Sequence, residues 1–565
     1  MPDHQGVMPT QGTKNIITSN GSLPWGTAFG TAALAFVLVF SVYLLLRPPL
    51  YNYDGYTYRL EALQPLQGDN LNPHHLLWYP IQKGIAALST VLGSPSPEAF
   101  QLSGILINSF ALALLCLLLV WLTHRRVLPM AMTIFIAFSP HIWSLGLQNQ
   151  PYTLLNFCIV AFLWAVAEWN APSRLRWTTS GLALASAVLL QQAMALAVPA
   201  VAIGFIIAGP GRWKTRLWRA SAWVGGITLG VAAVYVLMAR AAGVEPGGFL
   251  NWTLEYMQDQ HGIQVQWPQT AIKCVIGMAG AMVESSWIRD RFNPQSNSAA
   301  LWRLYGTLLV VVCIASVAIL SRRRVRERLV HLLRSNPSFA SVLMMVLAWS
   351  GFVLLWEPTG HFWGVMLFPL AFLASWWVRV SRKQTAMAVA GALLVVSSWN
   401  LHANHRQDQA YSVNFPPPML EQIRAELGPQ DVFIIAGRDW YANRDYSLLL
   451  ECLDDWPRDP AMALLDDYVM KGSQKEWQQK LDTDIRAAFA AGGRVYVADH
   501  VFWPDSYRDL EQTADPFSAY AHMEYAGLGG ERLTGEIKSF FDRYRLVPSG
   551  FKVGTDPYWE LKRNE

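Results

Sequence analysis

Apolar runs long enough to cross a lipid bilayer recur through most of the chain, and they constrain its fold more than any other feature. One helix needs about 17–25 such residues to cross. Only 15% of the 565 residues are charged, against roughly 25% in soluble proteins, so lipid is the expected solvent. The runs lie at 25–47, 101–122, 128–147, 151–169, 178–192, 194–209, 220–241, 301–320, 338–356, 362–379 and 384–400.

Basic residues between these runs predict the side on which each loop lies, because positive residues favour the cytoplasmic side. The basic clusters are at 124–126, 174–176, 212–219, 322–328 and 379–383. All of them fall on one side only if the segment 178–209 crosses twice, as two short helices rather than one long tilted helix. The sequence therefore predicts about 11 spans, with the N-terminus inside and the C-terminus outside.

This topology divides the chain into a cytoplasmic tail (1–24), a membrane domain (25–400) and an extracytoplasmic region (401–565). The membrane domain carries two long outer loops, 48–100 and 242–300. The second of these contains the apolar stretch TAIKCVIGMAGAMVESSW, which is short for a span and is expected to form a helix lying in the membrane interface.

The C-terminal region predicts a small α/β domain. Its segments 431–436 and 494–498 are typical of short buried strands, and helix-like segments lie near 446–453 and 473–491. Strands that alternate with helices form an α/β layer. The predicted fold is thus an α-helical polytopic membrane protein with a C-terminal extracytoplasmic α/β domain.

Several function classes find no support in the sequence. The five cysteines form no CxxC pair, so neither a zinc site nor a disulfide framework is expected. There is no phosphate-binding GxxxxGK[ST] loop, no HExxH and no GxSxG elbow. The small net charge of +4 gives no reason to expect nucleic-acid binding.

The first outer loop holds the strongest candidates for chemistry. Asp54 lies shortly after the first span, among several tyrosines, where partial desolvation would raise the pKa of its carboxyl and favour its use as a base. A solvated loop acid, or the N-cap of a short helix over 55–63, is the alternative. His74 and His75 point in different directions, so they suit hydrogen bonding to a phosphate better than metal binding. A plain helix start is equally compatible with this pair.

Two further outer segments carry ionisable residues. Glu357 and His361 lie in a very short turn between two spans, where ionisable residues are candidates for function. Arg289 and Arg291, in the second outer loop, could neutralise a phosphate. A simple hairpin turn and ordinary surface charge are the respective alternatives.

The motifs YNYDGYTYRLEA (with Asp54), NPHHLLWYP and EPTGHFWGVMLFPL, together with the topology, resemble the GT-C superfamily of polytopic membrane glycosyltransferases. Protein O-mannosyltransferases and the aminoarabinose transferase of lipid A are similar enzymes. The resemblance implies transfer of a sugar from a polyprenyl-phosphate donor to an extracytoplasmic glycan, lipid or protein, with Asp54 as the base. It implies that Glu357 and His361 line the same cavity.

The resemblance also implies binding of the donor phosphate by His74, His75, Arg59 or an outer-loop arginine, in an enzyme of the bacterial inner membrane. The second acid found beside the catalytic one in several members has no counterpart next to Asp54, so use of a divalent metal, Mg²⁺ or Mn²⁺, stays open. Two other functions remain as alternatives. One is a transporter or flippase for a lipid-linked or polar solute, and the other is a membrane-anchored assembly or binding protein.

Overall fold

The computed structural model describes most of the membrane region and part of the C-terminal region. The described residues are 24–48, 58, 62, 73–92, 97–148, 150–169, 173–253, 269–283, 323–355, 360–413, 428, 430–435, 462–464, 474–498, 536–537, 539–553 and 556–563.

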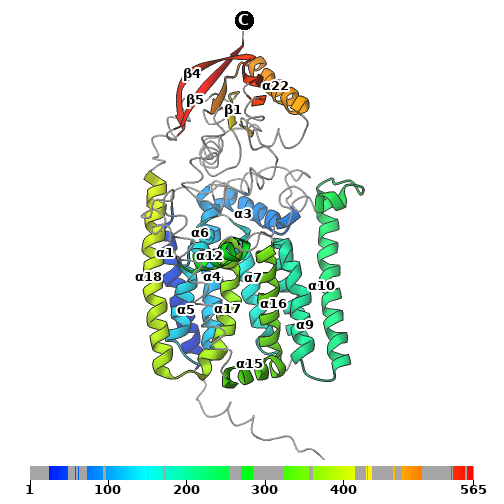
Figure 1. The fold of residues 1–565 in the computed structure, drawn as a ribbon, viewed down its shortest axis with the longest axis vertical. Helices are drawn as coiled ribbons and strands as arrows, with labels where there is room; N and C mark the ends of the chain where they lie inside the picture. Colours follow the sequence, from blue (N-terminus) through cyan, green and yellow to red (C-terminus); the bar gives the residue numbers. More distant parts are fainter. Residues whose placement is uncertain are drawn as a thin grey trace, which may run out of the picture.

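Helices account for nearly all of the described membrane region (Figure 1), because inside lipid a helix satisfies its backbone groups internally. They are α1 (Trp25–Leu46), η3 (Pro73–His75), α3 (Trp78–Leu92), α4 (Pro97–Thr123), α5 (Val127–Ala137), α6 (Pro140–Gly146), α7 (Pro151–Val166), α8 (Arg174–Leu190), η4 (Gln192–Leu196), α9 (Ala197–Ala208), α10 (Trp213–Ala241), α12 (Gln269–Met282), α15 (Arg323–Ser335), α16 (Pro337–Leu355), α17 (Gly360–Val380) and α18 (Lys383–Val413).

Most of these helices coincide with the predicted spans. Among the described residues, 6 helices are long and apolar enough to cross a membrane, or up to 7 if the bent pair α5–α6 is one span. Helix α7 and the stretch Gln192–Ala208 are shorter apolar helices. The predicted run 301–320 lies outside the described residues, so the total of 11 spans stays a prediction.

The segment 178–209 folds as two helices, as the charge pattern predicts. Helix α8 ends at Leu190, and Gln191 is extended, with φ −154° and ψ 104°. The ring of Trp177, near the start of α8, lies 4.7 Å from that of Phe205, near the end of α9. The two helices therefore run back along each other.

Close packing holds the bundle together where small residues let backbones approach. A Cβ atom added to Gly204 of α9 would lie 2.6 Å from the carbonyl carbon of Ala340 on α16. The Ser341 hydroxyl donates a hydrogen bond to the Val201 carbonyl across the same contact, at 3.0 Å. Any larger residue at position 204 would push these two helices apart.

Helices α3 and α15 run across the bundle rather than along it, one at each end (Figure 1). Helix α15 lies at the end farthest from the C-terminal sheet, and α3 lies at the end nearest to it. We call these the α15 end and the α3 end. Helix α12, which corresponds to the predicted interfacial helix, also lies across the bundle, and it packs against α17.

The C-terminal region forms a mixed sheet of order β2-β1-β3-β5-β4 with helix α22 beside it. Its elements are β1 (Val432–Ile435), β2 (Met462–Leu464), α22 (Gln474–Ala490), β3 (Val495–Ala498), β4 (Tyr544–Val553) and β5 (Asp556–Arg563). Strand β1 pairs in parallel with β2 and β3, and β5 pairs antiparallel with β3 and β4. Both predicted strands and the helix predicted at 473–491 are present, whereas the segment 446–453 lies outside the described residues.

Candidate functional site

The two histidines of the first outer loop lie in the short turn η3, which is docked on the end of α8. Because the last carbonyls of a helix have no partner within it, they must find donors elsewhere. The Leu190 carbonyl lies 2.6 Å from Nδ1 of His75, and the Leu77 amide donates to the Leu189 carbonyl at 3.2 Å. The loop therefore caps the helix break.

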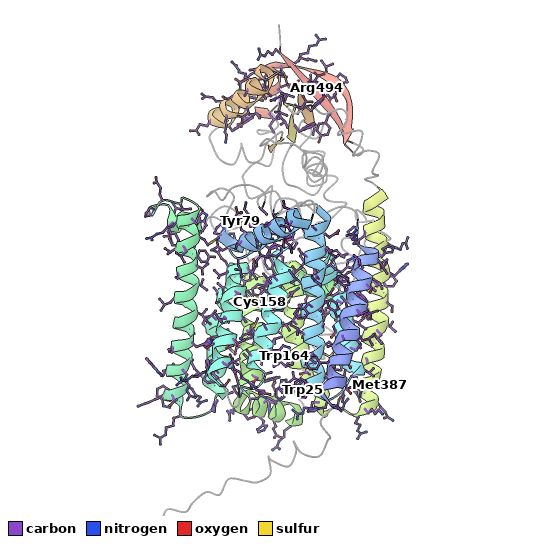
Figure 2. All side chains as sticks on the ribbon, turned by 180° about the vertical axis from the view of Figure 1, so that it is seen from behind. Trp25, Tyr79, Cys158, Trp164, Met387 and Arg494 are labelled. Atoms are coloured by element: carbon purple, nitrogen blue, oxygen red, sulfur yellow. The ribbon has the colours of Figure 1, made fainter. Side chains whose placement is uncertain are left out.

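A second anchor holds the same turn against α10. The hydroxyl of Tyr235 donates to the Pro73 carbonyl at 2.7 Å. Around this bond Leu76, Tyr79 and Trp252 form a buried apolar cluster that includes Tyr235. Tyr79 marks the α3 end of the bundle in Figure 2. Three segments distant in sequence thus fix the histidine turn.

The two histidines differ in environment. His74 is buried, and burial, followed by the nearby charge of His75, lowers the pKa of its imidazole to about 3. Burial thus favours the neutral form of this imidazole, and the phosphate contact predicted for His74 stays a prediction. His75 is only partly buried, and its ring faces Tyr58 at 5.8 Å and Tyr152 at 6.3 Å.

His75 must carry its proton on Nδ1, because a carbonyl oxygen only accepts hydrogen bonds. Its Nε2 therefore accepts a proton when the ring is neutral and donates to an anion only when the ring is protonated. The hydrogen bond to the Leu190 carbonyl therefore determines whether Nε2 of His75 accepts or donates a hydrogen bond in each protonation state.

The turn between α6 and α7 carries Gln148 and Gln150 and lies beside this site, because Tyr152 at the start of α7 has its ring 6.3 Å from that of His75. The amide of Gln101 on α4 donates to the Leu147 carbonyl at 2.9 Å and to the Pro48 carbonyl at 3.4 Å. Pro48 is where the chain leaves α1 for the loop that carries Asp54. Gln101 therefore joins the start of that loop to the α6–α7 turn.

The end of α17 that carries His361 also reaches this region. A Cβ atom added to Gly364 would lie 3.0 Å from Cβ of His141 on α6, so α6 and α17 are in close contact there. Trp349 on α16 donates to the Phe362 carbonyl at 2.8 Å. The backbone of His361 is described but its side chain is not.

The remaining predicted site residues lie outside the described part of the chain. They are Asp54, Arg59, Arg289, Arg291 and Glu357. Their roles stay predictions. Within the described residues, no group of three or more His, Cys, Asp or Glu side chains could hold a metal ion.

Sequence reasoning missed Tyr235 and Gln101, which hold the site in place. Tyr235 lies inside a run expected to be a plain span, and Gln101 stands at the first position of another. The sequence offers one signal for each residue, which is a side chain able to form hydrogen bonds near the end of an apolar run. That signal does not identify the residue to which the side chain binds.

The apolar helices form a bundle typical of a polytopic membrane protein. At its α3 end, the first outer loop is held against α8 and α10 by the hydrogen bonds of His75 and Tyr235, and the candidate polar site lies at that end. No protein-family model matches the sequence, and no curated protein matches it. Among solved structures, the chain is similar to ArnT from Cupriavidus metallidurans bound to undecaprenyl phosphate. The TM-score is 0.50 at 11% identity, covering 95% of this chain and 98% of ArnT.

An archaeal oligosaccharyltransferase, AglB from Archaeoglobus fulgidus, solved with an inhibitory peptide and a dolichol-phosphate, matches with a TM-score of 0.44 at 11% identity. That match covers 93% of this chain and 74% of AglB. The ArnT match extends over nearly the whole of both chains, so this chain shares the fold of ArnT.

Proposed function

We propose that this protein is a membrane glycosyltransferase that moves a sugar from a polyprenyl-phosphate-linked donor to an extracytoplasmic acceptor. The observation that carries the proposal is the anchored His75 turn, which the structure places at the α3 end of a GT-C fold. The ArnT structure with the same fold holds undecaprenyl phosphate, which supports a lipid-linked donor. The proposal includes location in a bacterial inner membrane, with the C-terminal region outside.

In the proposed reaction, Asp54 takes the proton from the acceptor hydroxyl. The acceptor oxygen then forms a bond to the anomeric carbon of the sugar, and the bond between that carbon and the phosphate oxygen breaks. The electron pair leaves with the polyprenyl phosphate. His75, protonated on both nitrogens, would donate from Nε2 to the departing phosphate, which lowers the barrier by stabilising the charge that develops there.

The other predicted site residues take supporting roles in this proposal. Arg59, Arg289 and Arg291 would contact the phosphate, where arginine forms bidentate hydrogen bonds. Glu357 and His361 would line the cavity beside α6. No step requires a metal, and addition of Mg²⁺ or Mn²⁺ to the purified enzyme tests whether one contributes.

Replacement of Asp54 tests the proposal directly. We expect Asp54→Asn to lower sugar transfer at least 100-fold, as loss of a general base does, while expression and thermal stability stay unchanged. The measurement is release of labelled sugar from a polyprenyl-phosphate donor in detergent. Asp69→Asn is the matched control, because it removes the same charge from the same loop, and it should keep full activity.

The same assay separates the alternatives. A flippase would leave the labelled donor uncleaved in both the wild-type protein and the variant. Full transfer activity in Asp54→Asn would contradict the assignment of the base. Binding of a target by residues 401–565, with no effect of Asp54, would support an assembly or binding protein instead.

A further inference from the structure

Helix α15 is strongly basic, and it lies at the end of the bundle opposite the candidate site (Figure 1). Its sequence, RRVRERLVHLLRS, contains five arginines and one glutamate. Three leucines, Leu329, Leu332 and Leu333, pack against the core of the bundle. The helix is therefore held in place by its apolar side, and its basic side faces away from the protein.

The exposed side of α15 has a defined pattern. Arg326, Val330 and Arg334 are exposed and follow each other at intervals of four residues, which places them in one row along the helix. Val330 is 39% exposed between the two arginines. Glu327 pairs with Arg323 at 2.7 Å, so the one acidic side chain is already neutralised.

Three other basic residues at this end are engaged with the protein itself. Arg125 donates to the Ser381 carbonyl at 2.6 Å, and Arg216 donates to the Ile207 carbonyl at 2.8 Å. Arg176 pairs with Glu168. By contrast, Arg326 and Arg334 make no hydrogen bond or ion pair with any residue that the structure describes.

Exposed tryptophans place this end of the bundle at the membrane surface. Trp25 begins α1 and is 55% exposed, while Trp213 and Trp218 near the start of α10 are 59% and 74% exposed. Figure 2 shows Trp25 at the end of the bundle farthest from the sheet. Indole rings gather at the boundary between lipid tails and headgroups, so α15 lies at headgroup level.

We propose that the row Arg326–Val330–Arg334 binds the headgroup of an anionic phospholipid in the leaflet beside α15. In this row, one arginine lies one helical turn before Val330 and the other lies one turn after it. The two arginines would contact the lipid phosphate, and Val330 would contact the start of an acyl chain. Anionic headgroups supply the negative charge that this face lacks, and the membrane brings them to the level of the helix.

The test is titration of the full-length protein in detergent with phosphatidylglycerol or phosphatidylcholine, with bound lipid measured by native mass spectrometry. We expect preferential binding of phosphatidylglycerol. Each arginine near an anionic surface contributes roughly a fivefold factor, so Arg326→Gln with Arg334→Gln should weaken binding by about 30-fold. Added salt should weaken the wild-type interaction as well.

A matched control removes the same charge elsewhere. Arg240 on α10 and Arg545 on β4 are exposed, and the double change Arg240→Gln, Arg545→Gln should leave the binding unchanged. Arg326→Lys with Arg334→Lys keeps the charge and should retain most of the affinity. A melting curve for each variant verifies folding.

Three outcomes would overturn the proposal. One is equal binding of the two lipids by the wild-type protein. Another is equal loss of binding in the control and the α15 variants. The third is displacement of phosphatidylglycerol by soluble glycerol phosphate at the same concentration, which would indicate a site for a free anion instead of a lipid.

Discussion

At the scale of single residues, His75 has two separable duties. Its Nδ1 holds the Leu190 carbonyl at 2.6 Å, while its Nε2 is the atom proposed to meet the phosphate. Asparagine can reproduce the first duty but not the second, because its side-chain N–H lies close to where Nδ1–H lies in histidine.

We therefore expect His75→Asn to melt at nearly the wild-type temperature and to lose about 100-fold in kcat/KM, as for a lost donor to a developing charge. His75→Ala should lose the same activity and in addition about 1 kcal/mol of stability, from the uncapped carbonyl. Melting curves and transfer rates of both variants provide the measurement. Full transfer activity in His75→Asn would show that His75 serves only to cap α8.

The sequence singles out the histidine pair but not the difference between its members. His74 is buried because η3 docks on α8 and α10, and the bond from Tyr235 to Pro73 joins residues 162 positions apart. No local sequence pattern predicts such a contact.

The role of Asp54 as the base, in contrast, is predicted only from its place after the first span and from the GT-C resemblance.

At the scale of elements, α18 presents a row of polar side chains to the bundle. Asn400 donates to the Met282 carbonyl at 2.8 Å and Asn404 to the Phe138 carbonyl at 3.1 Å. Asp408 accepts from the indole of Trp143 at 2.9 Å. These contacts stabilise the end of α12 and the bend between α5 and α6.

Asp408 lies just beyond the apolar span, which ends at Arg406. Burial raises the pKa of its carboxyl from 3.8 to about 6, against the opposing effect of the Trp143 hydrogen bond. The folded protein thus binds more protons than the unfolded chain between about pH 4 and pH 6. Stability falls as the pH rises through that window and stays lower above it.

Asp408→Asn keeps an oxygen that accepts the bond from Trp143 but removes the charge. We expect the variant to match the wild-type protein near pH 4 and to gain about 1–3 kcal/mol above pH 6. Tryptophan fluorescence melts at several pH values measure this difference. Parallel pH profiles for the two proteins would contradict the role assigned to the carboxylate.

The helices could be predicted from the apolar runs, but their breaks could be predicted only in part. The break at Gln191 follows from the distribution of basic residues. The bend of 68° between α5 and α6 falls inside the run 128–147, where Pro140 is its one local signal. Strand β4 was missed because Pro548 and Gly550 interrupt its pattern.

At the scale of the whole molecule, the arrangement predicts on which side of the membrane each part lies. The sheet and η3 lie toward one end of the bundle and α15 at the other (Figure 1). We expect Arg545→Cys on β4 to react with an impermeant maleimide in intact spheroplasts, and Ser335→Cys on α15 to react only after permeabilisation. The unmodified protein gives the background from its own cysteines. Labelling of both positions from one side would contradict the predicted topology.

The overall class of the molecule was accessible from the sequence because lipid permits few architectures. The packing of the site could not be predicted in the same way. It depends on hydrogen bonds that join Pro48 to α4, Pro73 to α10 and Leu190 to η3. Such pairings depend on how the helices pack, and an apolar surface in lipid leaves many arrangements open.

The capping of α8 by the first loop has a consequence for how the protein is made. His75 leaves the ribosome 115 residues before Leu190, which at roughly 5–20 residues per second is on the order of 10 s. During that interval the carbonyl that will hold its imidazole does not yet exist. The histidine turn is therefore completed only after α8 has been synthesised and inserted, so the nascent chain passes through the membrane-insertion machinery before this turn has formed.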